Sequence, residues 1–143
     1  MNKSKLFVTA SAVTASLVAV TGVSAAGFTD VEASNPHYEN ILALHEAGVI
    51  SGYPDGTFKP AQAVTRGQAA KMLVNAYDLT KGDKTVYFTD VSASNEYAEA
   101  IQILASQGII NGYVDGTFKP TEEITRGQFA KILTNILGLT ASG

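Results

Sequence analysis

The chain of 143 residues contains no cysteine. Disulfide bonds, thiolate metal sites and a cysteine nucleophile are therefore excluded. Tryptophan is also absent, and charged residues make up only 16% of the sequence. With 10 basic and 13 acidic residues, the chain lacks the excess of positive charge that a nucleic-acid-binding face needs. The stability of the folded chain must therefore come from packing.

The first 26 residues have the order of features that is typical of a secretory signal peptide. Lys3 and Lys5 make the start positive, residues 6–20 are apolar or small, and residues 23–26 end the segment with small side chains. This order predicts export and cleavage near residue 26, and no membrane association afterwards. An uncleaved anchor is the alternative, although the stretch is near the minimum length that spans a bilayer. Cleavage leaves 8 basic and 13 acidic residues, a net charge of −5.

The rest of the chain consists of two copies of one unit. Residues 28–80 align with residues 88–140 without a gap, and more than half of the aligned positions are identical. A constant offset of sixty residues is the pattern of a tandem structural repeat. We therefore divide the chain into a signal peptide (1–26), a first repeat (28–80), a polar connector (81–87) and a second repeat (88–140).

Each repeat contains the step Thr-Arg-Gly-Gln, at residues 65–68 and 125–128. A threonine followed three residues later by glutamine, just before an apolar run, is the pattern of a capping box, in which each side chain accepts a hydrogen bond from the backbone N–H of the other residue. The step therefore predicts helices over residues 66–77 and 126–137. The four predicted capping residues are Thr65, Gln68, Thr125 and Gln128.

The arginine inside each step needs a separate explanation. Arg66 and Arg126 occupy the first helical position, where unpaired N–H groups and the helix dipole already make the potential positive. A cation there costs up to ~1 kcal/mol. Two interpretations are open. Each arginine pairs with a carboxylate of the protein, for which Asp30 and Asp90 are the candidates, or the guanidinium and the helix start together bind an anion.

The first half of each repeat predicts a short extended opening, at residues 28–31 and 88–91, followed by a helix. Asn35 is a suitable N-cap with Pro36 at the first helical position, and Asn95 holds the matching place. Apolar residues then recur with helical spacing. The helices are predicted to end at two glycines in the left-handed conformation, Gly48 and Gly108.

A loop of sequence Gly-Tyr-x-Asp-Gly-Thr-Phe-Lys-Pro joins the two helices of each repeat, at residues 52–60 and 112–120. Its Asp-Gly pair signals a turn. The sequence thus predicts a mostly α protein, a helical bundle of two helix-loop-helix repeats that must pack together to bury their apolar faces. Aromatic and cationic side chains of the loop suit a polar, anionic, sugar-like ligand, and these are Tyr53, Lys59, Tyr113 and Lys119.

Nothing in the sequence indicates catalysis. Glu122 and Glu123 form an adjacent acid pair that the first repeat does not share, and the hydroxyl groups lack an activating base. His37 and His45 occur only in the first repeat, and their spacing of eight residues does not suit a metal site, so we interpret them as surface residues. We expect no enzyme activity, no bound metal and no cofactor.

Four features of each repeat, in the same order, resemble the S-layer homology (SLH) family. The family's repeat has a Phe-x-Asp-Val opening, a helix that ends in Gly-Ile, a Gly-Tyr-x-Asp-Gly-Thr-Phe-x-Pro loop and an Ile-Thr-Arg-Ala-Glu helix start. The matching segments of this chain are residues 28–31, 48–49, 52–60 and 64–68 in the first repeat and 88–91, 108–109, 112–120 and 124–128 in the second. The resemblance implies a secreted module that anchors proteins non-covalently to the bacterial cell wall and cell surface. In Gram-positive bacteria its implied ligand is a secondary cell-wall polysaccharide, often carrying pyruvate ketals, and in other envelopes a peptidoglycan-linked polymer.

The resemblance also assigns residues. Arg66 and Arg126 match the family's ligand-contacting arginine, and a pyruvate ketal carries the kind of carboxylate that such an arginine holds. Gly48 and Gly108 match the glycine that lets a sugar approach closely.

Three departures from the family pattern bear on this assignment. The tryptophan usual on the first helix is replaced by Pro36 and Glu96, and the helix start reads Thr-Arg-Gly-Gln. Two repeats occur where the family commonly has three, which leaves open self-association or association with other SLH proteins. The alternative function is a cell-surface adhesion or assembly module that binds other proteins, with the arginines only bracing the fold.

Overall fold

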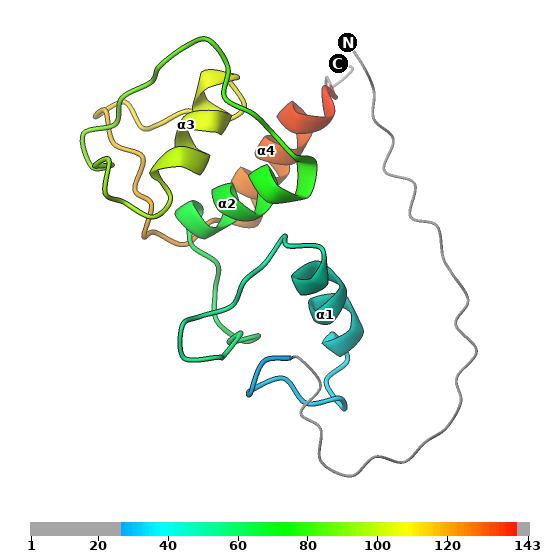
Figure 1. Ribbon diagram of the computed structural model, residues 1–143. Helices are drawn as coiled ribbons and strands as arrows, with labels where there is room; N and C mark the ends of the chain where they lie inside the picture. The colour runs from blue at the N-terminus through cyan, green and yellow to red at the C-terminus, as the bar shows by residue number, and fades with distance from the viewer. Residues whose placement is uncertain (1–26, 140–143) are drawn as a thin grey trace.

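The computed structural model describes residues 27–139, and all regular secondary structure in that range is helical. The predicted signal peptide, residues 1–26, lies outside the described residues. The four helices are α1 (Tyr38–Glu46), α2 (Arg66–Tyr77), α3 (Ala98–Ser106) and α4 (Arg126–Leu137) (Figure 1). Each repeat contributes two of them, joined by a long loop. Within residues 27–139, no helix has the length and apolarity to cross a bilayer.

The second helix of each repeat begins and ends where the sequence predicts. At α2 the Thr65 hydroxyl accepts a hydrogen bond from the Gln68 amide at 3.3 Å, and the Gln68 side-chain oxygen accepts one from the Thr65 amide at 3.0 Å. Thr125 and Gln128 form the same capping box at α4. These reciprocal bonds satisfy amide groups that no helical carbonyl can reach, which fixes the first turn locally.

The first helix of each repeat begins later than the sequence predicts. The Asn35 side chain accepts a hydrogen bond from the His37 amide at 2.8 Å, and its carbonyl accepts one from the Tyr38 amide at 3.0 Å. These bonds close a turn that includes Pro36, so the prediction of an Asn35 cap with Pro36 at the first helical position is wrong. Asn95 forms the matching turn before α3. The asparagine carboxamide stabilises a turn in place of a helix start.

The opening of each repeat is a turn and not the extended segment that we expected. The Val31 amide donates to the Phe28 carbonyl at 3.2 Å, which places the Asp30 carboxylate against the loop. Its two oxygens accept hydrogen bonds from the Phe58 and Lys59 amides, both at 2.7 Å. Two successive amides turn toward one anion only in an unusual backbone conformation, and Lys59 has a φ of 59°. In the second repeat the same contacts join Asp90 to Phe118 and Lys119.

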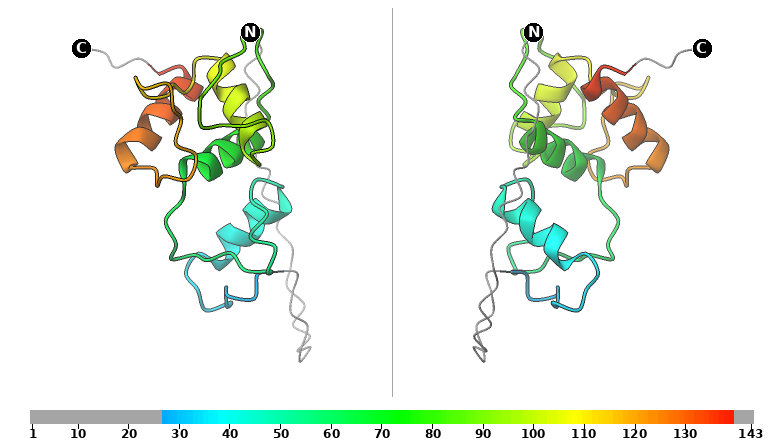
Figure 2. Two further views of the ribbon diagram at one scale, coloured as in Figure 1. Left: turned by 90° about the vertical axis from the view of Figure 1, so that its left-hand side faces the viewer. Right: turned by 90° about the vertical axis from the view of Figure 1, so that its right-hand side faces the viewer.

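The larger hydrophobic core crosses the boundary between the repeats. Helix α2 of the first repeat packs on α3 of the second, and α4 covers the other side (Figures 1 and 2). The centre of this core is α3, whose Ile101 and Leu104 are completely buried. Each repeat is thus too small to bury its own second helix, and the two repeats share one core.

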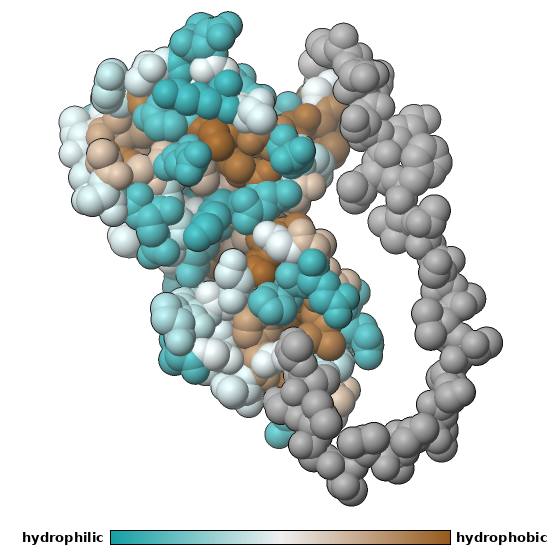
Figure 3. All heavy atoms as spheres, viewed as in Figure 1, coloured by the Kyte–Doolittle hydropathy of each residue, from teal (hydrophilic) through white to brown (hydrophobic). Residues whose placement is uncertain are grey.

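Helix α1 stands apart from that core and has only a small one of its own. Phe28, Val31, Ile41 and Ile50 form it, and Met72 of α2 packs against it. In both views of Figure 2, α1 lies away from the group of α2, α3 and α4. Apolar side chains therefore reach the surface over this part of the molecule (Figure 3).

Backbone hydrogen bonds join the start of α2 to the loop of the second repeat. The bonds run from Arg66 N to Glu122 O (2.8 Å), from Gly67 N to Pro120 O (2.8 Å) and from Ile124 N to Val64 O (3.0 Å). We call this set of contacts the repeat junction. It uses the first-turn amides of α2, which have no partner inside the helix.

Gly67 is the point of closest approach in the repeat junction. A Cβ atom at this position would lie 2.4 Å from Cδ2 of Tyr97 and 3.1 Å from the Pro120 carbonyl oxygen. Only glycine lets the tyrosine ring and the loop lie this close to the helix.

Replacing this glycine should therefore destabilise the protein. We expect Gly67→Ala to lower the free energy of unfolding by about 1–3 kcal/mol through overpacking. This loss should exceed the stabilisation that the higher helix propensity of alanine provides. Urea denaturation measures the loss. Because Tyr97→Ala removes the obstructing ring, the double variant should lose less than the sum of the two single variants. Strict additivity would show that the two residues do not interact.

Three aspartates, one in an opening turn and two in the loops, have pKa values below the usual range. The hydrogen bond from the Phe58 amide, with a further one from Lys59, lowers the pKa of Asp30 from the ordinary value of 3.8. The threonine two residues on lowers the pKa of Asp55 and of Asp115, chiefly through its hydroxyl. Because these pKa values are depressed in the folded state, the stability they contribute is complete above pH 3.8 and is lost as the pH falls through the lowered values.

We therefore expect the melting temperature to decrease as the pH is lowered below about 4. Asp30→Asn should lower the melting temperature at pH 7 and flatten its decrease in acid, because the amide no longer titrates. Calorimetry between pH 7 and pH 2 measures both slopes, and identical slopes for the two proteins would contradict this origin of the acid sensitivity.

Candidate ligand-binding site

Two cavities occupy equivalent places in the two repeats, each between the repeat's loop and its second helix. The repeat-1 cavity has a volume of about 320 Å³, and the repeat-2 cavity about 180 Å³. Polar lining residues of the repeat-1 cavity include Tyr53, Lys59, Gln68, Lys71, Glu96 and Tyr97. Those of the repeat-2 cavity are Arg66, Asn111, Tyr113, Gln128 and Lys131. Each cavity therefore takes side chains from both repeats.

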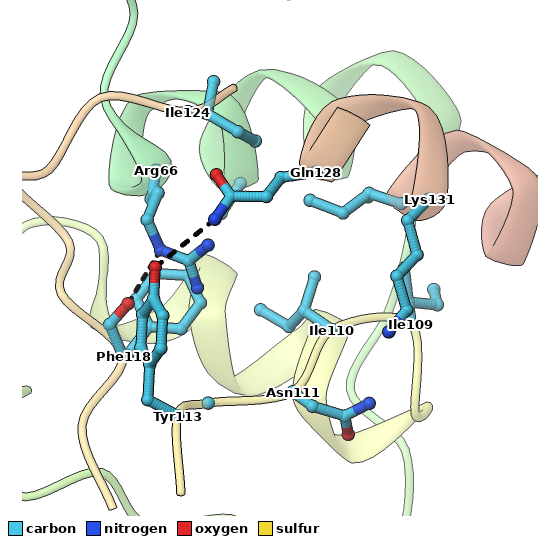
Figure 4. A pocket seen from close by; sticks show the side chains of 12 residues that line it. Arg66, Ile109, Ile110, Asn111, Tyr113, Phe118, Ile124, Gln128 and Lys131 are labelled. Carbon is cyan, nitrogen blue, oxygen red and sulfur yellow. Dashed lines mark hydrogen bonds between the residues drawn. The ribbon is translucent and has the colours of Figure 1, made fainter. Parts of the chain in front are cut away.

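Arg66 enters the cavity of the second repeat although it belongs to the first. Its Nε donates to the Phe118 carbonyl oxygen at 2.8 Å. Its guanidinium carbon lies 4.5 Å from the centre of the Phe118 ring and 4.9 Å from that of Tyr113. The residue is only 9% exposed. The start of α2 and the loop of the second repeat thus hold one cation in a fixed place (Figure 4).

Of the two interpretations of the arginines, the pairing with Asp30 and Asp90 does not occur among residues 27–139. Both carboxylates are bound to backbone amides of their own loops, as described above. Within residues 27–139, the ion pairs join Lys59 to Asp55 at 3.6 Å and Lys119 to Glu122 at 3.5 Å. Arg66 is instead held by a carbonyl oxygen and two aromatic faces. None of these three partners carries a full negative charge, so the positive charge of the guanidinium is not neutralised.

Among the residues that the structure describes, two cations and no carboxylate line the repeat-2 cavity. Arg66 lies at one end beside Tyr113, and the Lys131 side chain lies at the opposite end (Figure 4). Ile109 and Ile110 line it between them. Because the chain as a whole carries a net negative charge, this local excess of positive charge is a property of the site and not of the composition.

The glutamine of each capping box also positions a tyrosine. While the Gln68 oxygen caps α2, its amide nitrogen donates to the Tyr53 hydroxyl at 2.9 Å. Gln128 makes the same contact with Tyr113 at 3.4 Å. One side chain therefore ties the helix start to the loop, so the aromatic wall of the cavity is fixed before a ligand arrives.

The repeat-1 cavity has a more mixed electrostatic character. The Lys59 ammonium lies 4.1 Å from the centre of the Tyr53 ring, and Lys71 adds a second cation. Glu96 supplies a carboxylate on the same wall. Burial, with the charge of Glu96 as a smaller cause, raises the pKa of the Tyr97 hydroxyl, which stays protonated at neutral pH.

Several residues that the sequence singled out lie away from both cavities. Arg126 is exposed at the start of α4. Gly48 and Gly108 end the first helices with a φ of 71°, as expected for left-handed caps, but neither lines a cavity. Lys119 also lies outside them, with its ammonium 4.6 Å from the centre of the Tyr113 ring.

Two lysines of the cavities were not predicted from the sequence, and one histidine is more buried than predicted. Lys71 and Lys131 line the cavities one helical turn after Gln68 and Gln128, a spacing that would have placed them on the same face. His45 is half-buried and not a surface residue. Its Nδ1 lies 3.1 Å from the Ile50 carbonyl oxygen, because the ring packs on Phe28 with a centroid distance of 4.8 Å.

Comparison with known proteins identifies relatives along the whole chain. A surface-layer 125 kDa protein of Lysinibacillus sphaericus is 38% identical over 99% of this chain, which spans 12% of that protein. A cellulosome-anchoring protein of Acetivibrio thermocellus is 37% identical over 64% of the chain and 21% of its own length. An S-layer protein of Bacillus thuringiensis subsp. finitimus is 34% identical over 88% of the chain and 16% of its own length.

The chain thus spans about a fifth or less of the length of these relatives. The S-layer homology domain matches it twice, at residues 27–70 and 87–130. Each match contains one opening turn, the first helix, the loop and the capping box with its arginine, the parts that build the cavities. The chain belongs to the S-layer homology domain family, with two tandem copies of the domain.

Proposed function

We propose that this protein is a non-covalent anchoring module that binds an anionic secondary cell-wall polysaccharide. Its family and the names of its relatives support a cell-surface, cell-wall-associated location and a structural role without enzyme activity. The polymer class, a pyruvylated glycan or another peptidoglycan-linked polymer, is our own proposal. The observation that carries it is the pair of cations in the repeat-2 cavity with no acid beside them.

An anion is the ligand that this charge distribution favours. Arg66 is nearly buried, where solvent screens its charge less than at the surface. Its Nε is engaged with the Phe118 carbonyl, and the guanidinium offers further N–H groups in a planar fork that suits a carboxylate. A carboxylate on a sugar, as in a pyruvate ketal, provides such a group, and Lys131 provides a second positive charge across the cavity.

The remaining lining suits a sugar ring. Tyr113 provides an aromatic face, and Ile110 an apolar wall. The amides of Asn111 and Gln128 can donate to hydroxyl groups. A cavity of about 180 Å³ is smaller than the roughly 300–1,000 Å³ of sites for drug-sized molecules. We therefore expect one sugar unit and its carboxylate to bind there, with the polymer continuing outside.

Arg66 has a second role in the fold, which decides how the proposal is tested. Because it bonds to the loop and packs between two rings, Arg66→Ala should weaken the repeat junction as well as remove a ligand contact. Loss of binding in that variant would not separate the two roles. Lys131 is exposed and forms no ion pair among residues 27–139, so it tests the charge of the cavity alone.

We expect Lys131→Glu to weaken binding to purified cell-wall sacculi at least tenfold, about 1.4 kcal/mol, and to leave the melting temperature nearly unchanged. Co-sedimentation with sacculi at several protein concentrations measures the affinity. Lys84→Glu, in the connector and outside both cavities, makes the same change in net charge and is the matched control. Equal losses in the two variants would mean that only overall charge matters.

Treatment of the sacculi tests the polymer. Removal of the secondary polysaccharide should abolish binding, and mild acid hydrolysis of its ketals should weaken binding by removing the carboxylate that Arg66 holds. Binding should also fall as salt is raised, since part of it is electrostatic. Equal retention on stripped sacculi would rule out polymer binding and favour a surface module that binds other proteins.

A further inference from the structure

The start of α4 is uncovered where the start of α2 is covered. The buried residues of α2 are Arg66, Gly67, Ala69, Ala70 and Leu73. Helix α4 has the same capping box and the same Arg-Gly-Gln sequence, yet none of its residues is buried. Phe129 is 36% exposed, whereas its counterpart Ala69 is 1% exposed.

The first repeat has the complementary uncovered surface. In the second repeat, Phe118 and Pro120 are buried beneath Arg66 and the start of α2. Their counterparts Phe58 and Pro60 are half-buried and exposed. The same difference holds between the first helices, since Leu104 of α3 is fully buried and Leu44 of α1 is 44% exposed.

Gly127 indicates that the start of α4 is built for a close contact. Glycine weakens a helix by up to about 1 kcal/mol relative to alanine. Gly67 has a reason for this, because the Tyr97 ring leaves no room for a Cβ atom. A Cβ atom on Gly127 would meet nothing within 4 Å among residues 27–139. Within the described part of the chain, Gly127 therefore has no packing role.

We propose that the start of α4 of one molecule docks on the first repeat of a second molecule, and that this contact reproduces the repeat junction between molecules. The occupant is specified by sequence. The loop at residues 52–60 of the second molecule has eight of the nine residues of the loop at 112–120, and differs only in Pro54 for Val114. A surface that fits one of these loops has the chemistry to fit the other.

The repeat junction gives the expected contacts by position. The Arg126 amide would donate to the Gln62 carbonyl, and the Gly127 amide to the Pro60 carbonyl of the second molecule. The Arg126 guanidinium would then lie against Tyr53 and Phe58, as Arg66 lies against Tyr113 and Phe118.

The ring that covers Gly127 would be His37, which holds the place of Tyr97. In this contact, Arg126 of one molecule would enter the repeat-1 cavity of the second molecule. No arginine lines that cavity among the described residues of a single molecule.

The contact is head-to-tail, because it joins the second repeat of one molecule to the first repeat of the next. Such a heterologous contact closes into a ring or continues as a chain, whereas a symmetric dimer would join like surfaces. This difference makes the arrangement testable with variants that each lose one surface.

Sedimentation of the purified chain in buffer without polymer tests the proposal. We expect concentration-dependent association in the wild type, and at least a tenfold rise in the dissociation constant for Gly127→Ala, whose methyl group would meet the docked ring. Lys84→Ala, which is remote from both surfaces, should associate as the wild type does. A wild-type monomer at all concentrations, or Gly127→Ala association equal to that of the wild type, would overturn the proposal.

A mixing experiment tests the head-to-tail arrangement. Leu44→Asp disrupts the docking surface on α1 and leaves the start of α4 intact. Gly127→Ala disrupts the start of α4 and leaves the α1 surface intact. Each variant alone should sediment as a monomer, whereas an equal mixture should form heterodimers that grow no further. Circular dichroism shows whether Leu44→Asp is folded. If mixing produces no heterodimer from folded variants, the head-to-tail contact is excluded, and because no polymer is present this result leaves the proposed function unaffected.

Discussion

The docking of the α2 start on the loop of the second repeat is the contact on which the rest of the structure depends. It uses first-turn amides that a helix cannot satisfy internally, and it gives them the carbonyls of Pro120 and Glu122 as partners. The same contact buries Gly67 against Tyr97 and brings α2 onto α3. Without it, α2 would expose its apolar face and the cavity of the second repeat would lose its arginine.

This contact gives Arg66 a role in the fold in addition to the ligand contact that we propose. Arg66 stabilises the junction through the Phe118 carbonyl and two aromatic rings, and it also lines the cavity. A positive charge held in this way is fixed in position before a ligand binds, which reduces the entropy lost on binding. The unfavourable potential at the helix start remains, so the anion that we propose as ligand would stabilise both the helix and the site.

Local chemistry decided which elements were predictable. The helices α2 and α4 follow from a capping box whose hydrogen bonds join residues three apart, so the sequence contains the whole interaction. The starts of α1 and α3 were missed because Asn35 and Asn95 have two local options, a cap and a turn, and the turn formed. The Asp30 contact was misassigned because its partners lie 28 and 29 residues away along the chain.

Only the tertiary structure decided that Arg66 and Arg126 have different surroundings, since the start of α2 packs on the loop of the second repeat whereas Arg126 is exposed at the start of α4. It also decided that Lys131 completes the cation pair while Gly108 lies elsewhere. The physical reason is that burial and charge at a site depend on which segments meet in space, and the meeting here crosses from one repeat to the next.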